Sequence, residues 1–567
     1  MSPGLPLLGA RALDLTLAWR AGQPISGGQF IAEAQALAEA LPARGRPVNL
    51  CQDRYLFALG LAAALLRGQT SLMPPNALAD TLRQIPAGDS PPYALLDDAT
   101  LDIGGLQRVV VERPRGVAPA SANPLIAAEL EAVCLLTSGS TGPPQPHAKR
   151  WGPLVANIEA EAERLAELLG RPDLHGLTLL ATVPAQHSYG FESSVLLALL
   201  GGAMFDAGRP FYPADISTAL QRLAPPRALI TTPFHLKTLL LAGLEIPALD
   251  LLLSATAPLS PQLAAEAERR TGGRLVEIYG CTEAGQVAAR RTTAGETWTA
   301  LGRLHLWHET VPDADGTAER FMVAGGHVVE PTPLADVLVL EDARRFRLLG
   351  RANDLIHVAG KRSSLAHLNF HLNRITGVDD GAFWMPDEVA EAVVRPLAFV
   401  VAPTLNAAQV IHALREHLEA TFVPRHVIFV DALPREATGK LTAQVLKAFA
   451  QRVLAEQQGR YPIDAAHPAF AGHFPGQPLL PGVVLLSLVM QTLQRRPALR
   501  TRLGAAPSIE QVKFLAAVRP GATLQVTLRE HGNGVNFEVM RHDDAGQTLA
   551  ARGRLTARTA GAAGTTA

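Results

Sequence analysis

Residues 136–150 read Leu-Thr-Ser-Gly-Ser-Thr-Gly-Pro-Pro-Gln-Pro-His-Ala-Lys-Arg, and the interpretation of the chain starts from this stretch. The apolar residues 132–136 predict a buried strand that leads into it. Hydroxyl residues then alternate with glycines, so that backbone N–H groups and hydroxyls can form a concave phosphate site. These residues are Thr137, Ser138, Gly139, Ser140, Thr141 and Gly142. The alternative is a small polar surface turn, and the spacing is not that of a Walker loop.

A second stretch, residues 277–285, reads Glu-Ile-Tyr-Gly-Cys-Thr-Glu-Ala-Gly. Together the two stretches resemble the adenylate-forming superfamily of acyl-CoA synthetases, aryl-acid ligases and peptide-synthetase adenylation domains. The phosphate loop of that superfamily reads roughly T-S-G-[ST]-T-G-x-P-K, and its later motif reads Y-G-x-T-E. Gln145 stands where the superfamily has lysine, and the nearest basic residues are Lys149 and Arg150. Which side chain meets the pyrophosphate therefore stays open.

Three further stretches extend the resemblance over nearly the whole chain. Residues 350–362 resemble the hinge motif of the superfamily, and residues 433–441 resemble its terminal lysine loop. Residues 466–491 contain Gly-His-Phe-Pro-Gly-Gln-Pro-Leu-Leu-Pro-Gly-Val, which resembles the signature of hotdog-fold hydroxyacyl-carrier-protein dehydratases. The resemblance implies a large adenylate-forming domain over residues 1–350, a mobile small subdomain over 351–452 and a hotdog domain over 460–558.

Strand and helix patterns alternate along the first 280 residues or so and predict an α/β fold with mostly parallel strands. The clearest strand candidates are residues 178–183, 228–231, 249–254 and 274–279. The clearest helix candidates are residues 155–169, 233–241 and 261–271. We expect the small α/β subdomain and then an α+β hotdog domain to follow.

Composition restricts the function classes. With 567 residues and 48% hydrophobic residues the chain can form several domains. A net charge of −1 gives no electrostatic argument for binding nucleic acid or an anionic membrane. The three scattered cysteines show no metal or disulfide spacing, and the apolar run 55–66 is too short to span a membrane. We therefore expect a cytoplasmic protein without a membrane span.

Adenylation joins a carboxylate to the α-phosphate of ATP, so two anions must be held together by cations and hydrogen-bond donors. The resemblance implies ATP and Mg²⁺, with Glu283 holding the metal, Thr282 donating to the α-phosphate and Lys440 bridging the two reactants. It assigns the remaining nucleotide contacts to Ala255, Thr256, Ala257, Tyr279, Gly280, Asp336, Arg351 and Arg362. The alternatives are a helix N-terminal carboxylate for Glu283, a solvated loop residue for Asp336 and an exposed turn residue for Lys440.

His187 lies in Val-Pro-Ala-Gln-His-Ser-Tyr-Gly-Phe, where the superfamily places an aromatic or histidine gate of the acid pocket. The resemblance makes His187 a gating residue and puts Ser188 and Tyr189 in the pocket wall. A packed or solvated histidine is the alternative.

In the hotdog part, the dehydratase family pairs the histidine of its signature, here His473, with a carboxylate on the central helix. Counting five residues from Gly482 leads to Ser487, and the sequence has no Asp or Glu between Ala466 and Glu510. Serine cannot transfer protons near neutral pH without an activating neighbour. Either the module does not dehydrate or depends on a partner's carboxylate, or it is an active dehydratase.

The combination suggests an ATP-dependent acid:thiol ligase that activates a hydroxybenzoate-type acid. Its acceptor would be CoA or a phosphopantetheinyl acyl carrier protein, and the hotdog domain would form a homodimer. The arrangement is similar to the ligases of aryl polyene and xanthomonadin pigment pathways. A fatty-acyl synthetase with an active dehydratase and a non-catalytic scaffold that recruits carrier proteins are the alternatives.

Overall fold

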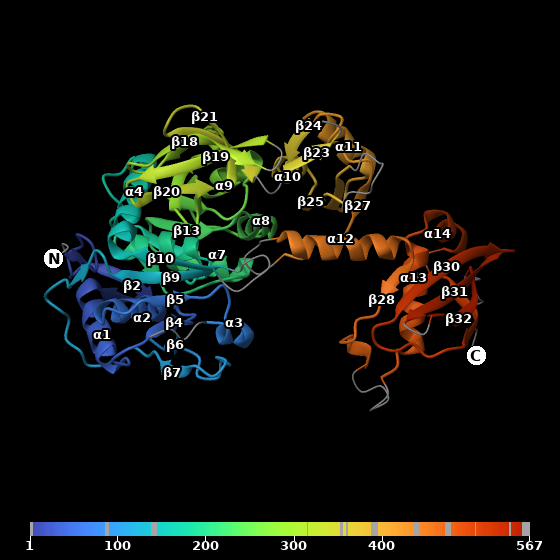
Figure 1. Cartoon of the computed structure of the whole chain (residues 1–567), viewed down its shortest axis with the longest axis horizontal. Helices are drawn as coiled ribbons and strands as arrows, with labels where there is room; N and C mark the ends of the chain where they lie inside the picture. Colours follow the sequence, from blue (N-terminus) through green and yellow to red (C-terminus); the bar gives the residue numbers. More distant parts are fainter. Residues whose placement is uncertain are drawn as a thin grey trace, which may run out of the picture. The chain divides into compact units, whose positions relative to one another are not determined.

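A computed structural model divides the chain into two compact units, Met1–Lys440 and Leu441–Ala567 (Figure 1). It describes residues 4–85, 90–137, 145–313, 316–351, 355–358, 361–386, 395–435, 441–470, 478–504, 506–543 and 546–557. None of the helices within these ranges is long and apolar enough to cross a membrane.

The first unit begins with a six-stranded sheet in the order β10-β9-β5-β4-β6-β7. Its strands are β4 (Arg46–Asn49), β5 (Ser71–Met73), β6 (Pro92–Leu96), β7 (Gln107–Val110), β9 (Glu131–Thr137) and β10 (Gln145–Arg150). All neighbours pair in parallel except β9 and β10, so the ends of β4, β6 and β9 lie at one edge. The associated helices are α1 (Gly27–Ala40), α2 (Arg54–Leu66) and α3 (Ala79–Arg83). Strand β9 ends at Thr137, the first residue of the predicted phosphate loop.

An eleven-stranded sheet forms the centre of the unit, in the order β21-β22-β17-β16-β15-β14-β13-β11-β12-β2-β3. Its parallel strands are β11 (Thr178–Ala181), β12 (Met204–Asp206), β13 (Arg227–Thr231), β14 (Leu251–Ser254) and β15 (Arg274–Cys281), and β2 (Thr16–Arg20) pairs in parallel with β12. The antiparallel margins are β3 (Gln23–Ser26), β16 (Gly285–Arg290), β17 (Trp298–Ala300), β21 (Asp336–Leu340) and β22 (Arg345–Arg351). Leu251, Leu252 and Leu253 are fully buried in succession, as expected of a parallel strand covered on both faces.

The longer helices of this sheet are α4 (Trp151–Leu169), α7 (Pro213–Arg222), α8 (Pro233–Leu241) and α9 (Pro261–Thr271). A shorter helical stretch consists of α5 (Ser188–Gly190), the π-helix η1 (Phe191–Leu196) and α6 (Leu197–Leu199). Gly190 is required there, because a Cβ atom at this position would lie 1.9 Å from the carbonyl oxygen of Pro184. π-Helical turns often mark functional segments.

The remaining elements of the first unit lie outside its two large sheets. They are β1 (Gly4–Pro6), β8 (Leu125–Ala127), η2 (Thr292–Ala294), β18 (His305–Asp313), β19 (Gly316–Gly325), β20 (Val328–Leu334), β23 (Leu355–Val358) and β24 (Lys361–Ser364). The segment after β24 has its own core and contains α10 (Leu365–Asn373), β25 (Asp380–Trp384), β26 (Leu397–Val401), α11 (Ala407–Arg415) and β27 (Val427–Phe429).

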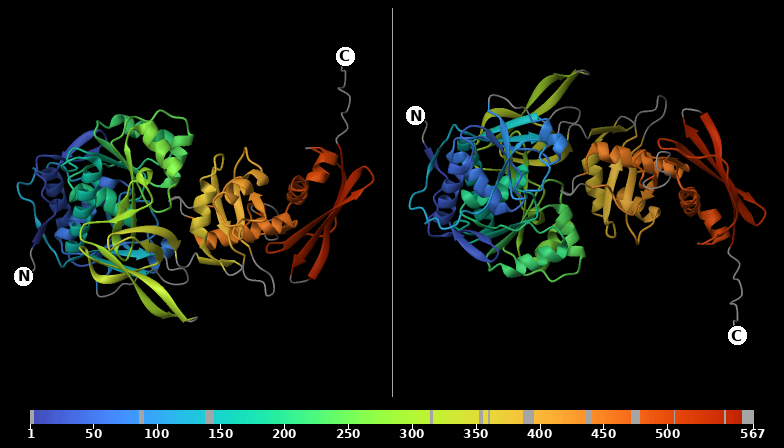
Figure 2. Two further views of the ribbon diagram at one scale, coloured as in Figure 1. Left: turned by 90° about the horizontal axis from the view of Figure 1, so that it is seen from above. Right: turned by 90° about the horizontal axis from the view of Figure 1, so that it is seen from below.

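The second unit begins with α12 (Ala443–Gln457) and has a five-stranded antiparallel sheet in the order β28-β30-β31-β32-β29. The strands are β28 (Arg460–Pro462), β29 (Ser508–Phe514), β30 (Thr523–His531), β31 (Gly534–Asp543) and β32 (Gly546–Thr556). Helices α13 (Gly482–Gln494) and α14 (Pro497–Leu503) and the 3₁₀ turn η4 (Pro468–Phe470) complete it. Leu485, Val489 and Leu493 of α13 belong to one core with the sheet, and the helix lies along one face of it (Figure 2).

The predicted fold class is confirmed. Helices α8 and α9 have the predicted bounds, and β11, β13, β14 and β15 lie within two residues of the predicted strands. The hairpin β2–β3 and the strands β16 to β22 had no counterpart in the prediction. β2 and β17 join the central sheet through β12 and β22, which are distant in sequence and which local patterns do not reveal.

Candidate functional site

Two residues predicted to contact the nucleotide meet at the end of β15. The Tyr279 hydroxyl donates a hydrogen bond of 2.7 Å to Oδ2 of Asp336, which begins β21. The Tyr279 ring lies 5.8 Å from that of Trp298 and 5.6 Å from that of Phe346, measured between centroids. The aromatic contacts fix the tyrosine ring, and the ring in turn orients the carboxylate.

The two residues predicted at the ribose are neighbours. Asp336 and Arg351 are directly opposite each other in the antiparallel pair β21–β22. Arg362 pairs with His357 in the hairpin β23–β24. The structure describes only the backbone of Arg351 and Arg362, and it therefore gives their positions in the strand register.

The stretch predicted to line the adenine pocket has an unusual backbone. Thr256 follows β14 with a φ of 80°, a region that β-branched residues rarely adopt. Such a conformation costs about 1–3 kcal/mol and occurs mostly at ligand sites. Two residues earlier, the Ser254 hydroxyl is buried without a hydrogen-bond partner. A strained turn beside an unsatisfied hydroxyl fits a ligand-binding edge at Ala255, Thr256 and Ala257.

Thr282 and Glu283 lie in the three-residue turn between β15 and β16. Cys281 pairs with Gly285 across this hairpin, and a Cβ atom on Gly280 would lie 2.3 Å from the Gly285 carbonyl oxygen. The close approach therefore requires glycine at position 280. The Glu283 residue is exposed, so its carboxylate can reach a metal ion in solution.

The residues present fit a Mg²⁺ ion that is held largely by its substrate. Across the described ranges, no group of three or more His, Cys, Asp or Glu side chains gathers into a metal site. Mg²⁺ commonly binds one or two carboxylates together with substrate phosphates and water. A single exposed carboxylate at Glu283, next to Thr282, is compatible with that mode.

The predicted acid segment, residues 187–189, borders β14, the strand that precedes the Thr256 turn. The Tyr189 hydroxyl donates a 2.8 Å hydrogen bond to the carbonyl oxygen of Leu253 in β14, three residues before Thr256. His187 is half-buried and directly precedes α5. The structure thus brings the predicted acid-pocket residues and the predicted adenine stretch to one strand end.

A set of hydrogen bonds at the ends of β4 and β6 anchors this segment from the other sheet. Gln186 donates a 2.9 Å hydrogen bond to the carbonyl oxygen of Cys51. The Asp97 carboxylate accepts from the backbone N–H groups of Gln52 and Asp53, and Asp53 caps α2. The position before His187 is therefore tied to a rigid strand end.

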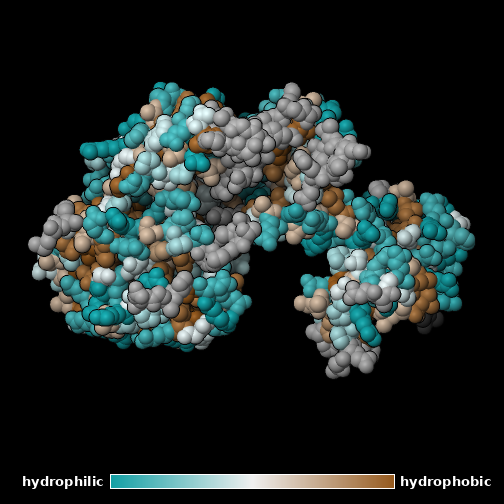
Figure 3. Space-filling view, in the orientation of Figure 1, coloured by the Kyte–Doolittle hydropathy of each residue, from teal (hydrophilic) through white to brown (hydrophobic). Residues whose placement is uncertain are grey.

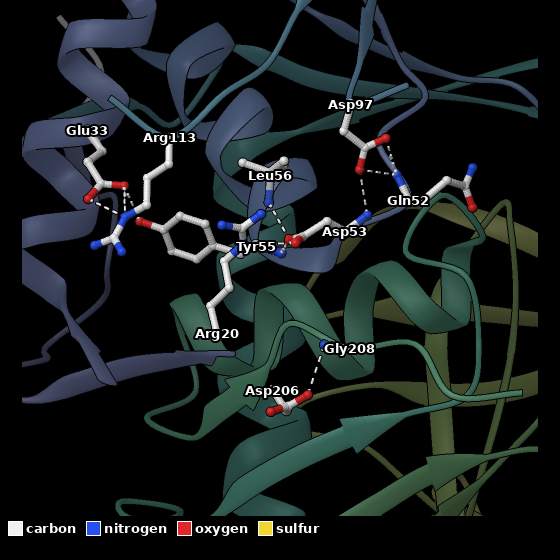
Figure 4. Close-up of polar contacts among 10 residues, drawn as sticks. All are labelled: Arg20, Glu33, Gln52, Asp53, Tyr55, Leu56, Asp97, Arg113, Asp206 and Gly208. Carbon is white, nitrogen blue, oxygen red and sulfur yellow. Dashed lines mark hydrogen bonds and ion pairs between the residues drawn. The ribbon is translucent and has the colours of Figure 1, made fainter. Parts of the chain in front are cut away.

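Arg20 and Glu33 extend this anchor. The Arg20 guanidinium lies 2.8 Å from the Asp53 carboxylate, and fully buried Glu33 accepts hydrogen bonds from Tyr55 and Arg113 (Figure 4). These charges are mutually paired, so we assign them a structural role at the base of α2.

Two buried carboxylates near the site were absent from the sequence-based prediction. Glu192 in η1 is 1% exposed and accepts from the Ser188 hydroxyl at 3.0 Å and from Nδ2 of Asn157 at 3.1 Å. Glu161 in α4 is fully buried, and the Ser193 hydroxyl donates to it at 2.7 Å. Burial, together with the charge of Glu192, raises the pKa of Glu161 to about 8. Glu161 follows Asn157 by four residues on the buried face of α4, and this helical spacing is the signal that could have revealed it.

The remaining predicted site residues lie outside the described part of the chain. These are Ser138, Gly139, Ser140, Thr141, Gly142, Lys440 and His473, together with the Thr137 side chain. In the second unit, Ser487 is exposed on α13, and a Cβ atom on Gly482 would lie 2.6 Å from the ring of Phe514. A side chain at position 482 would therefore displace that ring where α13 begins.

Comparisons with known proteins agree with this arrangement. Residues 56–311 match the AMP-binding enzyme family, residues 372–440 the AMP-binding enzyme C-terminal domain, and residues 451–554 the ApeI-like family, described as ApeI dehydratase. The 4-coumarate–CoA ligases of Halorhodospira halophila and Rhodobacter capsulatus are 31% and 30% identical over 310 residues. Each match covers 54% of this chain and 73% of the relative. The indoleacetate–CoA ligase of Aromatoleum aromaticum is 26% identical over 429 residues, 67% of this chain and 77% of that protein.

Solved structures show the same fold. ATP-bound MatB from Rhodopseudomonas palustris superimposes with a TM-score of 0.64 at 19% identity, covering 78% of this chain and 96% of that one. The o-succinylbenzoate CoA synthetase MenE from Bacillus subtilis, in complex with its acyl-adenylate, gives 0.60 at 20% identity, over 76% and 94%.

The Tyr279–Asp336 pair, the Thr256 turn and the segment around His187 thus lie in an AMP-forming acid ligase. The chain is a member of the AMP-binding, adenylate-forming ligase family and carries a C-terminal ApeI-like hotdog dehydratase domain. This confirms the resemblance inferred from the sequence.

Proposed function

We propose that the protein activates an aryl carboxylic acid as its adenylate and transfers the acyl group to a thiol. The observation that carries this proposal is the hydrogen bond from Tyr189 to the Leu253 carbonyl. This bond holds the acid segment beside β14, and the Thr256 turn follows that strand. A carboxylate held at the acid segment would lie close to a nucleotide held at the Thr256 turn. Such positioning lowers the barrier of a two-substrate reaction.

The residues divide the chemical work. Tyr279 and Asp336 would hold the ribose, with Arg351 opposite, and Arg362 would act at the phosphates. Mg²⁺, when bound at Glu283, would neutralise charge on the phosphates. The loop from Thr137 to Gly142 would bind the leaving pyrophosphate. Lys440, on a mobile small subdomain of residues 351–452, would bring a cation to the carboxylate and the α-phosphate.

The acid is proposed to be a hydroxybenzoate-type compound. Relatives named for 4-coumarate and indoleacetate act on acids that carry an aromatic ring, which supports an aryl substrate here. His187 and Ser188 offer polar contacts for a ring hydroxyl, and His187 would gate the pocket. A place in an aryl polyene or xanthomonadin-like pigment pathway is part of the same proposal, supported by the ApeI-like domain.

The acyl acceptor is proposed to be CoA or a phosphopantetheinyl carrier protein. The CoA ligases among the relatives support CoA. The positive charge of the second unit supports a carrier protein, because residues 441–567 contain 14 Lys and Arg against 7 Asp and Glu. Arg496, Arg500, Arg519 and Arg529 are exposed there and would attract a negatively charged carrier protein.

The hotdog domain is proposed to bind acyl thioesters as a homodimer with weak or no dehydration of its own. Strand β29 lies at the edge of the sheet, with Ile509 and Phe514 exposed, and Val483 is exposed on α13. Figure 3 shows hydrophobic surface on this unit. A second copy that covered the edge would bury these side chains.

An ATP–pyrophosphate exchange assay over a panel of aryl and fatty acids tests the proposal. Exchange that depends on an aryl acid supports it, and exchange with fatty acids alone points to the fatty-acyl alternative. Absence of acid-dependent exchange points to the non-catalytic scaffold. Acyl transfer to CoA and to holo-carrier protein, measured by mass spectrometry in the same reactions, then separates the two acceptors.

A further inference from the structure

We propose that Lys149 and Glu192 hold the metal-binding turn of residues 282–284 from two sides, and that Glu192 connects this turn to the acid segment. Lys149 is assigned as a positioning residue that acts through Glu283. The inference rests on the proposed function, in which Glu283 holds the metal ion.

Lys149 bridges the two sheets of the first unit. It lies on β10, at the edge of the six-stranded sheet, opposite Val133 of β9. Its Nζ donates a 2.6 Å hydrogen bond to the carbonyl oxygen of Glu283, in the turn between β15 and β16 of the larger sheet. This contact fixes the backbone of the residue whose side chain is predicted to meet the metal.

Glu192 reaches the same turn from the acid segment. Ser188, the residue after His187, donates to Oε1 of Glu192, and Asn157 donates to Oε2. A Cβ atom on Gly285 would lie 3.2 Å from Nδ2 of Asn157 and 3.8 Å from Oε2 of Glu192. The end of the metal-binding turn therefore rests directly on the Asn157–Glu192 pair.

The positive charge of Lys149 also acts on Glu192. Burial raises the pKa of Glu192, and the Lys149 ammonium is the strongest influence that opposes this rise. A buried carboxylate without any compensating charge or hydrogen bond would cost several kcal/mol. Lys149 thus contacts Glu283 directly while its charge compensates a carboxylate bonded to Ser188.

Glu192 connects the proposed acid site with the proposed metal site. A shift of Ser188 on acid binding would change its hydrogen bond to one carboxylate oxygen of Glu192, and the other oxygen lies beside Gly285. Residues that orient a metal ligand from behind are commonly worth about 10–100-fold in metal affinity. We therefore expect the pair to set the affinity for Mg²⁺ more than the affinity for the acid.

The experiment uses the full-length chain with Lys149→Met, Lys149→Arg, Glu192→Gln and the double variant Lys149→Met/Glu192→Gln. Isothermal titration calorimetry measures Mn²⁺ binding to the ATP-saturated protein without acid, and exchange assays measure the Mg²⁺ needed for half-maximal rate. We expect Lys149→Met to weaken metal binding by about tenfold or more, with partial rescue in Lys149→Arg. In the double variant the two losses should not add, because both residues hold the same turn.

The exposed pair Arg269–Glu266 on α9 provides the control. Its atoms lie 2.7 Å apart, and the side chains are 70% and 42% exposed. Arg269→Met and Glu266→Gln should leave metal binding within about twofold, because exposed pairs contribute little.

Metal binding by Lys149→Met within about twofold of the parent would overturn the inference, as would strictly additive losses in the double variant. Glu283→Gln separates this failure from that of the proposed function. If Glu283→Gln weakens metal binding and Lys149→Met does not, only the positioning role is wrong. If Glu283→Gln has no effect, the metal assignment itself is wrong. Should Lys149→Met fail to fold, Lys149→Arg and Glu192→Gln carry the same comparison.

Discussion

The two units of the chain differ in the sign of their charge. Residues 1–440 contain 37 Lys and Arg against 45 Asp and Glu, a net charge of −8, whereas residues 441–567 contain 14 against 7, a net charge of +7. Summed over the whole chain the net charge is −1, which hides the difference between the two units. Electrostatic arguments about partners therefore have to be made for each unit separately.

The units also differ in how they use carboxylates. The ligase unit has an exposed Glu283 and two buried glutamates, Glu161 and Glu192, around its site. In the hotdog unit the central helix has Ser487 at the expected carboxylate position. Adenylation by the first unit is supported by its family membership, whereas dehydration by the second unit is proposed to be weak, absent or dependent on a partner's carboxylate, because Ser487 stands at the carboxylate position. The following predictions test this contrast.

The largest effect is expected in the hotdog unit. The full-length protein should dehydrate a 3-hydroxyacyl carrier-protein substrate about 10²–10⁴-fold more slowly than an enzyme with a complete acid–base pair. Mass spectrometry of the enoyl product measures the rate. Rapid turnover that disappears in His473→Ala would show that Ser487, or a partner's carboxylate, suffices.

Lys440→Ala should abolish adenylation and leave the fold intact. Removing one positioned electrostatic group typically costs about 10²–10³-fold in rate. ATP–pyrophosphate exchange measures the loss, and an unchanged circular dichroism melting curve serves as the control. Exchange within about threefold of the parent would exclude the bridging role of Lys440.

Reversing charge on the hotdog unit should weaken carrier-protein binding. Arg496→Glu and Arg500→Glu are each expected to lower the affinity by about two- to fivefold, and added salt should reduce the difference. Surface plasmon resonance with holo-carrier protein measures this. Arg269→Glu, at an exposed position of the ligase unit, is the control, and an equal loss there would argue against a docking role for the basic unit.

The smallest expected effect concerns stability and pH. The pKa of Glu161 is raised from 4.5 to about 8, so the folded protein binds this proton more tightly than the unfolded chain. Its contribution to stability is full below about pH 4.5 and is lost as the pH rises through about 8. Glu161→Gln should therefore raise the melting temperature by about 2 °C or more near pH 9 relative to the parent, with little gain near pH 5. Differential scanning fluorimetry across this range measures it, and an equal shift at both pH values would contradict the prediction.

The sequence by itself determined the family, the parallel-sheet fold class and the positions of the motif loops. Residues 136–142 and 279–283 could be interpreted because a phosphate or metal site built from one loop needs its residues close together in sequence. Strand β14 could be predicted because a strand buried on both faces is a continuous apolar run.

Only the tertiary structure decided which distant residues meet. Tyr279 and Asp336 are 57 positions apart and share a hydrogen bond. Lys149 contacts Glu283 across 134 positions. The strained backbone of Thr256 and the burial of Glu161 and Glu192 are likewise invisible in local patterns. Sequence spacing predicts periodicity within an element, but whether a charge is buried, and what compensates it, depends on how separate sheets and helices pack.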